Sequence, residues 1–166
     1  MPDARRLVYW DANVFLDYIE GNPTRLPVLE ALLDDSANPR GTIQIVTSTI
    51  SIVEVAFAVH EKINRILDSH IEVRLNDLWT DEQAVKLAEF HDLVATEARA
   101  LMRRGLEMGM RLKPMDAIHL ATAARLEVAE FRTYDASLRK YAPIVGFPIV
   151  EPHTLQPRLF GGTWER

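Results

Sequence analysis

The 166-residue sequence contains no cysteine, which excludes disulfide bonds and thiolate zinc sites. It also lacks an apolar run long enough to span a membrane, and residues 1–6 lack a signal-peptide core, so we expect a cytoplasmic protein outside the membrane. Basic residues are fewer than acidic ones, 19 against 24, which gives a net charge of −5. This balance argues against nucleic-acid binding by overall positive charge, but leaves open binding through cations held at an acidic site.

The composition is typical of one folded domain. Hydrophobic residues make up 48% and charged residues 26% of the chain, and this length can enclose a full core. We expect a single domain over residues 1–150 and a loosely held tail, residues 151–166, that contains Gly161 and Gly162. Three tryptophans are expected to be packing residues: Trp10, Trp79 and Trp164.

Strands and helices are predicted to alternate along the chain. The apolar run 7–10 is rich in strand formers and ends on Asp11, after which apolar residues recur at helical spacing. The later pattern predicts helices at 26–33, 48–68, 115–126 and 136–141, and strands at 42–47, 71–75, 131–133 and 147–150. A capping box at 80–83 predicts a further helix that runs to Gly105, as one helix or as two joined near Asp92. The fold class is therefore α/β with a mainly parallel sheet.

Four acids stand at corresponding places in this pattern. Asp11 follows the first strand and Glu54 lies one turn into the helix after the second. Asp116 opens a helix after a proline, and Asp135 follows the strand at 131–133. The carboxyl ends of parallel strands share one edge, where ligands bind. Clustered carboxylates without His or Cys need neutralising cations and favour Mg²⁺ or Mn²⁺, which orient a phosphodiester and activate water.

Each acid also has an ordinary structural explanation. Asp11 and Asp135 could cap the helices that follow them, and Asp116 could stabilise a helix dipole. Residues 51–54 read S-I-V-E, so Glu54 could be the end of a capping box. All four acids having only such roles, at four corresponding positions, is the weaker hypothesis.

Neighbouring residues carry further hypotheses. The hydroxyls of Ser48 and Thr133 could orient a carboxylate or a water molecule, or could serve ordinary turns, and Asn13 could face the site or cap the first helix. His119, three residues after Asp116, is expected to be a packed core histidine because no second histidine stands at ligand spacing. A basic group could hold an RNA backbone or form a solvated helix face: Arg103, Arg104, Arg111 and Lys113.

Four segments together resemble the PIN-domain family, and in particular VapC-type toxin ribonucleases. They read V-Y-W-D-A-N-V-F around Asp11, T-S-T-I-S-I-V-E-V around Glu54, K-P-M-D-A-I-H-L-A-T-A around Asp116, and R-T-Y-D-A-S-L around Asp135. The resemblance runs from residue 8 to about residue 150 and implies a three-layer α/β/α domain with a central sheet of about five strands. The segment 92–111 is longer than is usual in compact members of the family.

The resemblance also implies a function. It implies a metal-dependent endoribonuclease, the toxin of a toxin–antitoxin pair, in which a water activated by the ion attacks phosphorus. Asp11, Asp116 and Asp135 would hold Mg²⁺ or Mn²⁺, Glu54 would complete the cluster directly or through water, and Thr133 would support it. Partners would be RNA, a second copy of the chain in a homodimer, and an antitoxin whose tail occupies a groove near the active site.

Three other functions stay open. A phosphatase with Asp11 as nucleophile would follow from D-x-D, but the second position is Asn13 and no lysine is clearly placed to neutralise the phosphate. A non-catalytic PIN scaffold that binds RNA or protein would be expected to have lost acids, whereas all four are present. Cleavage of DNA, as in flap-type relatives of the fold, is the third.

Overall fold

A five-stranded parallel sheet lies at the centre of the computed structural model, which describes residues 4–154. The strand order is β3-β2-β1-β4-β5, and every neighbouring pair is parallel. The strands are β1 (Arg6–Trp10), β2 (Ile43–Ser48), β3 (Val85–Ala88), β4 (Glu130–Arg132) and β5 (Ile149–Val150). The expected sheet of about five strands is therefore confirmed.

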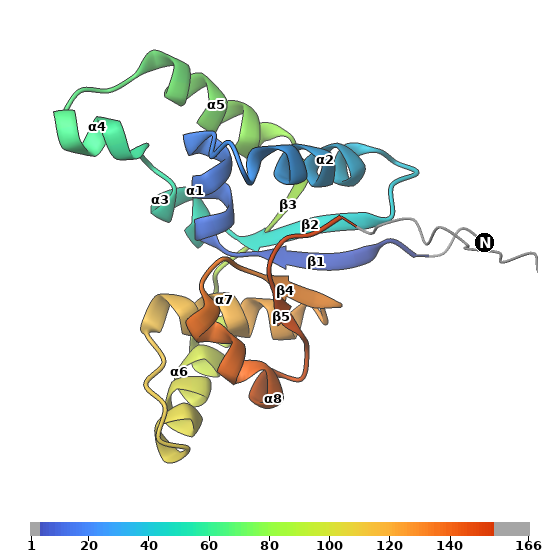
Figure 1. Cartoon of the computed structure of the whole chain (residues 1–166). Helices are drawn as coiled ribbons and strands as arrows, with labels where there is room; N and C mark the ends of the chain where they lie inside the picture. The colour runs from blue at the N-terminus through green and yellow to red at the C-terminus, as the bar shows by residue number, and fades with distance from the viewer. Residues whose placement is uncertain (1–3, 155–166) are drawn as a thin grey trace, which may run out of the picture.

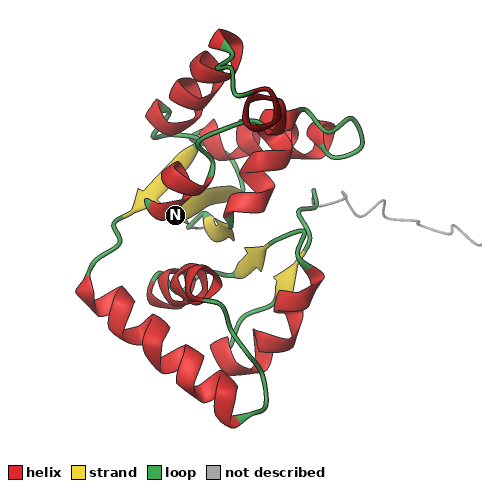
Figure 2. Ribbon diagram, turned by 90° about the vertical axis from the view of Figure 1, so that its left-hand side faces the viewer, coloured by secondary structure: helices red, strands yellow, loops and turns green. Residues whose placement is uncertain are grey.

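Helices cover both faces of this sheet. One face carries α1, α2 and α5, and the other carries α6, α7 and α8 (Figure 1). The view in Figure 2 shows the strands between these two groups of helices. The bounds are α1 (Ala12–Glu20), α2 (Leu26–Ala37), α3 (Ile50–Glu54), α4 (Val59–Asn64), α5 (Ser69–Thr80), α6 (Asp92–Glu107), α7 (Pro114–Arg125), the 3₁₀ helix η1 (Ala136–Tyr141) and α8 (Ala142–Val145). The three-layer α/β/α arrangement is confirmed.

The side chains of β1 alternate between two hydrophobic cores, one on each face of the sheet. Val8 and Trp10 pack with α1, α2 and α5, whereas Tyr9 packs with α6 and α7 on the opposite face. All three side chains are fully buried, because successive residues of a strand point to opposite faces of the sheet. Trp79 packs against the first core, and Trp164 lies outside the described residues.

The strand order places a topological switch point between β1 and β4. From β1 the chain adds β2 and β3 on one side, then crosses to add β4 and β5 on the other. The carboxyl ends of the two central strands are level, since Trp10 pairs with Arg132 and the Asp11 N–H donates to the Arg132 carbonyl. Ligands of parallel α/β proteins bind at such a crevice. These carboxyl ends point toward the left of Figure 1, where α3 and the start of α7 also lie.

The predicted strand at 71–75 is wrong, because these residues belong to α5. Ile71, Leu75 and Leu78 are buried while Val73 is 57% exposed, which is a helical and not an alternating pattern. The Asp68 carboxylate accepts a hydrogen bond from the His70 N–H and caps the helix.

The prediction of a helix from residues 80–83 to Gly105 is also wrong for residues 81–91, which do not belong to a helix. α5 ends at Thr80, and the Asp81 carboxylate accepts from the N–H groups of Gln83 and Ala84 in a turn. Residues 85–88 then pair with β2 as the edge strand β3. The helix that follows begins at Asp92 and ends two residues beyond Gly105.

The predicted helix over 48–68 is two short helices, α3 and α4, with a break at residues 55–58. α4 ends at Asn64, and the next residue, Arg65, has a left-handed φ of 55°. The last strand is shorter than expected, and residues 136–141 form a 3₁₀ helix. No helix within residues 4–154 is both long and apolar enough to cross a membrane.

Candidate metal site at the carboxyl edge of the sheet

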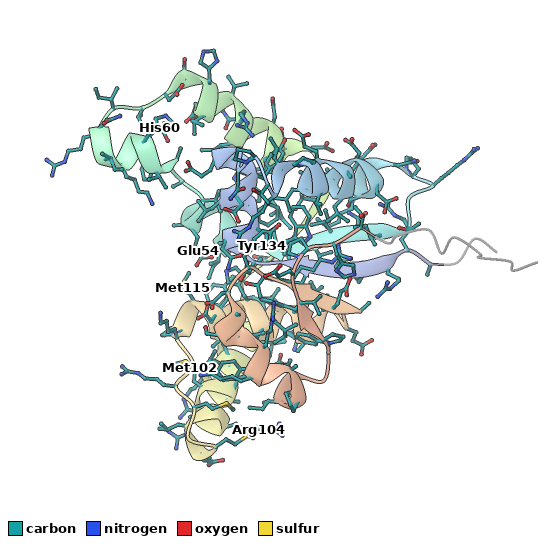
Figure 3. The ribbon with its side chains drawn as sticks, in the orientation of Figure 1. Glu54, His60, Met102, Arg104, Met115 and Tyr134 are labelled. Carbon is teal, nitrogen blue, oxygen red and sulfur yellow. The ribbon has the colours of Figure 1, made fainter. Side chains whose placement is uncertain are left out.

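Elements from distant parts of the chain meet at the carboxyl edge. Glu54 is the last residue of α3. Met115 lies in the first turn of α7 next to Asp116, and Tyr134 lies after β4 next to Asp135. Figure 3 shows these three labelled side chains together at the left end of the sheet, where β1 leads into Asp11. The four predicted acids therefore lie on segments that converge at one edge.

Asp11 is the most deeply buried of the four acids, with 4% of its surface exposed. It stands at the N-cap of α1 but makes no capping hydrogen bond with its side chain. Its Oδ2 accepts from Asn13 Nδ2 at 3.0 Å, while Oδ1 is buried without a hydrogen-bond partner among the described residues. Burial, helped by the nearby Asp116 charge, raises the pKa of Asp11 to about 7, although the Thr133 hydroxyl and the His119 ring lower it.

Asn13 and Thr133 connect the segments that follow β1 and β4 through hydrogen bonds. Asn13 Nδ2 also donates to Thr133 Oγ1 at 2.9 Å, and Asn13 Oδ1 accepts from the Tyr134 N–H at 3.0 Å. Thr133 Oγ1 accepts from the Asp135 N–H at 3.0 Å. Asn13 therefore faces the site, and both residues orient groups around Asp11.

Glu54 contacts His119, a residue that the sequence predicts to pack in the core. His119 is 2% exposed, as expected, but its Nε2 lies 2.5 Å from Glu54 Oε2 and its Nδ1 lies 2.7 Å from the Tyr9 hydroxyl. Glu54 does not close a capping box with Ser51, whose hydroxyl pairs with Thr47. The sequence signal for this contact is weak: His119 lies one turn after Asp116, on the same helix.

Asp116 and Asp135 differ in their surroundings. Asp116 lies in the first turn of α7, and its pKa is raised by partial burial and by the charges of Asp135 and Glu54. Its position also suits the helix dipole. Asp135 Oδ1 accepts from the Ser137 N–H at 2.9 Å and from the Ser137 hydroxyl at 2.6 Å, so it caps η1. One oxygen of Asp135 is thus engaged in capping.

Ser48 shows the turn chemistry that the sequence left open. Its hydroxyl accepts from the Ile50 N–H at 3.3 Å, and its own N–H donates to the Tyr9 hydroxyl at 3.0 Å. Within residues 4–154 the Ser48 side chain makes no hydrogen bond to the four acids.

The donor set at this edge fits a hard divalent cation. A buried, unpartnered oxygen such as Asp11 Oδ1 is costly unless an ion or water satisfies it. Neighbouring acidic charges also raise the pKa values of Asp11 and Asp116, and carboxylate oxygens are ligands that Mg²⁺ and Mn²⁺ prefer. As the side chains lie, residues 4–154 contain no group of three or more histidine and acidic residues that encloses an ion. One oxygen of Glu54 is bonded to His119 and one oxygen of Asp135 is bonded to Ser137.

Two shallow grooves are lined by residues near the acids. One, of about 420 Å³, is lined by Arg103, Arg111 and Lys113 just before Asp116. Arg104 lines a different groove, with Glu97 and Leu101. The four basic residues are all exposed, but the structure brings only three of them to one groove.

The other groove, of about 380 Å³, begins at Asn13 and Asp135 and includes Lys62. In it the Arg25 guanidinium stacks 3.8 Å above the Tyr134 ring. This groove was not predicted, because Arg25 and Tyr134 are far apart in the sequence. This groove also contains Asp17 and Glu20, and its exposed cation is Lys62, whereas the groove before Asp116 contains three exposed cations.

A parallel α/β/α domain with acids at its switch point belongs to the class of α/β proteins that bind a ligand at the carboxyl edge of the sheet. A comparison with family models identifies the family. Residues 8–143 match the model of the PIN domain. The match covers most of the sequence, and the chain belongs to the PIN-domain family. A search of curated proteins finds no match.

Solved structures share this fold at low sequence identity. VapBC2 from Rickettsia felis, bound to a DNA fragment from its promoter, has a TM-score of 0.61 and 13% identity over 89% of this chain and 99% of that chain. FitAcB from Neisseria gonorrhoeae has a TM-score of 0.58 and 16% identity over 87% and 97%. DNA-bound VapBC from Salmonella typhimurium has a TM-score of 0.55 and 13% identity over 88% and 97%. At these identities the comparison describes the fold.

Proposed function

We propose that this PIN-domain protein is a Mg²⁺- or Mn²⁺-dependent endoribonuclease and the toxin of a toxin–antitoxin pair. The observation that carries the proposal is the Asp11 carboxylate. It is buried at the switch point of the sheet, has an unpartnered Oδ1, and is surrounded by segments that bring three more acids. Such an arrangement is destabilising for the protein alone and becomes favourable when a cation binds.

The residues of the candidate metal site would have different roles in phosphodiester cleavage. Asp11, Asp116 and Asp135 would hold the ion, with Glu54 completing the cluster directly or through water. When bound, the ion supplies Lewis acidity that activates water and neutralises charge on the phosphate. Asn13 and Thr133 orient the acids through their hydrogen bonds.

RNA would approach along the grooves on either side of the acids. Arg103, Arg111 and Lys113 would contact phosphates on the Asp116 side, and Lys62 on the Asp135 side. These contacts are local, which is consistent with a net charge of −5, since phosphate binding needs positive charge only along the path of the strand.

The proposed partners are an antitoxin and a second copy of the chain, and the proposed location is the cytoplasm. The structural likeness to VapBC and FitAcB supports the proposal of an antitoxin partner. The phosphatase hypothesis is less well supported, because the Asn13 amide is engaged with Asp11, Thr133 and the Tyr134 N–H. An aspartyl phosphatase of the D-x-D type needs a free acid at that position.

The test is cleavage of total cellular RNA by the purified chain with Mn²⁺ or Mg²⁺, beside an EDTA control. Asp116→Asn keeps the size of the side chain and removes its charge, and the matched control is Asp77→Asn on an exposed part of α5. We expect discrete fragments that need metal, persist in Asp77→Asn and disappear in folded Asp116→Asn.

Other outcomes would contradict the proposal in different ways. Cleavage that survives in Asp116→Asn would remove Asp116 from the site. Preferred cleavage of DNA would change the substrate, and hydrolysis of a small aryl phosphate would favour the phosphatase. Binding of RNA without cleavage and without metal would favour a scaffold.

A further inference from the structure

A continuous chain of hydrogen bonds leads from the second core to Glu54. The Ser48 N–H donates to the Tyr9 hydroxyl at 3.0 Å, this hydroxyl lies 2.7 Å from His119 Nδ1, and His119 Nε2 lies 2.5 Å from Glu54 Oε2. Tyr9 and His119 are 0% and 2% exposed, so no step of this chain runs through bulk solvent. Its last member is one of the four acids of the candidate metal site.

In the neutral form of the imidazole, each member of this chain can donate a hydrogen bond to the next. Because the Tyr9 oxygen accepts from the Ser48 N–H, its own hydrogen is available for His119 Nδ1. With Nδ1 as acceptor, the ring hydrogen lies on Nε2 and is donated to Glu54 Oε2. A hydrogen bond from a ring N–H to a carboxylate is among the stronger kinds in proteins.

Tyr9 is held firmly enough to fix the histidine. Its ring stacks on Phe131 with centroids 5.0 Å apart and an interplanar angle of 11°. It also meets the His119 ring edge-on, at 5.8 Å and 68°. Tyr9 therefore supports the orientation of the imidazole from the core, on the side opposite the Glu54 contact.

Glu54, in contrast, has little to hold it within its own element. It is the last residue of α3, which has only five residues, and its side chain is 24% exposed. Among the described residues its Oε2 bonds to His119, and no partner engages its Oε1. A glutamate at such a helix end would otherwise sample several rotamers.

We propose that His119, oriented by Tyr9, is a positioning residue that fixes the Glu54 carboxylate with Oε2 on the imidazole and Oε1 free for the metal site. The inference rests on the proposed function and adds to it a residue outside the four acids. The partner of His119 Nε2 is one of the four acids, which places this contact at the candidate metal site.

The test compares Mn²⁺ binding by calorimetry in wild-type chain, His119→Leu, Tyr9→Phe and Glu54→Gln. Loss of a residue that orients a metal ligand typically weakens metal binding by about 10- to 100-fold. We expect a loss of this size in His119→Leu and a smaller loss in Tyr9→Phe. In the Glu54→Gln background, His119→Leu should cause no further loss, because the two residues act through one contact.

A matched control separates positioning from stability. Ser36 is fully buried, and its hydroxyl bonds to the Ala84 carbonyl and the Ile45 N–H, away from the acids. Ser36→Ala should lower the melting temperature and leave the Mn²⁺ affinity unchanged. The same pattern in His119→Leu, or an equal loss of affinity with and without Glu54, would overturn the inference.

A second measurement needs no variant of the core. Nitrogen-15 NMR of the unaltered chain should place the His119 ring hydrogen on Nε2, with Nδ1 as acceptor, and the opposite tautomer would overturn the inference. If wild-type chain binds no Mn²⁺ and cleaves no RNA, the proposed function fails and this role fails with it. If it binds Mn²⁺ and His119→Leu binds equally well, only the positioning role fails.

Discussion

Replacing Asp11 by asparagine is expected to stabilise the metal-free chain near neutral pH. Burial raises the pKa of Asp11 from 3.8 to about 7. At about 1.4 kcal/mol per tenfold change in proton binding, this rise corresponds to about 4 kcal/mol of destabilisation above pH 7. The asparagine carbonyl can still accept from Asn13, but its NH₂ group takes the place of the unpartnered Oδ1. An unsatisfied buried amide costs about 1–3 kcal/mol, which leaves a net gain of about 2 kcal/mol.

The sign of the pH dependence follows from the direction of the pKa change. Because the pKa of Asp11 is higher in the folded chain, proton binding favours folding fully below pH 3.8, and this contribution is lost as the pH rises through 7. Asp11→Asn should therefore gain at pH 8 and lose most of its advantage near pH 4, where Asp11 is neutral in the folded chain and only partly ionised in the unfolded chain.

Urea denaturation in EDTA at pH 8 and pH 4 measures this effect directly. For a chain of this size a gain of about 2 kcal/mol corresponds to a rise in melting temperature of about 4–8 °C. Asp35 is a matched control with the opposite sign, because hydrogen bonds from Thr42 and Ile43 lower its pKa. Asp35→Asn should destabilise the chain at pH 8. A loss of stability in Asp11→Asn at pH 8 would refute the reasoning.

Three further predictions concern other parts of the molecule. Gly41→Ala should cost at least about 2 kcal/mol in urea denaturation, since its Cβ would lie 1.8 Å from the Asp35 carbonyl oxygen; an unchanged midpoint would contradict the close approach. Arg132→Met should cost about 3–5 kcal/mol because it leaves the buried Glu130 unpaired, and adding Glu130→Gln should recover most of that loss; a double variant no more stable than Arg132→Met alone would contradict this. Lys113→Gln should raise the KM for RNA at unchanged kcat and lower the salt dependence by about one phosphate contact; an effect on kcat alone would move Lys113 out of the RNA path.

The central part of the fold could be predicted because its signals are local and unambiguous. The run 7–10 ends abruptly on Asp11, and Asp116 follows Lys113-Pro114 at the start of a helix. The five residues at 71–75 are too few to distinguish the two-residue period of a strand from the 3.6-residue period of a helix. Only Leu78, one turn further, shows that the pattern is helical. Residues 85–88 form a strand through pairing with β2, a contact that no local propensity records.

The site, like the fold, could be predicted from the sequence only in part. The convergence of four acids follows from topology, since each lies near a strand end or a helix start. The pairing of His119 with Glu54 joins residues 65 positions apart, and the position of His119 one turn after Asp116 is only a weak signal for it. The stacking of Arg25 on Tyr134 is invisible for the same reason.

The central claim is that the carboxyl edge of the sheet binds a divalent cation through Asp11. Anomalous diffraction from crystals of the chain grown with Mn²⁺ tests it most directly. We predict one manganese peak at about 2.1 Å from Asp11 Oδ1, the coordination distance of a small hard cation, with Asp116 as a second ligand, and no peak in Asp11→Asn. Manganese bound elsewhere on the chain, or a peak that persists in Asp11→Asn, would contradict the account.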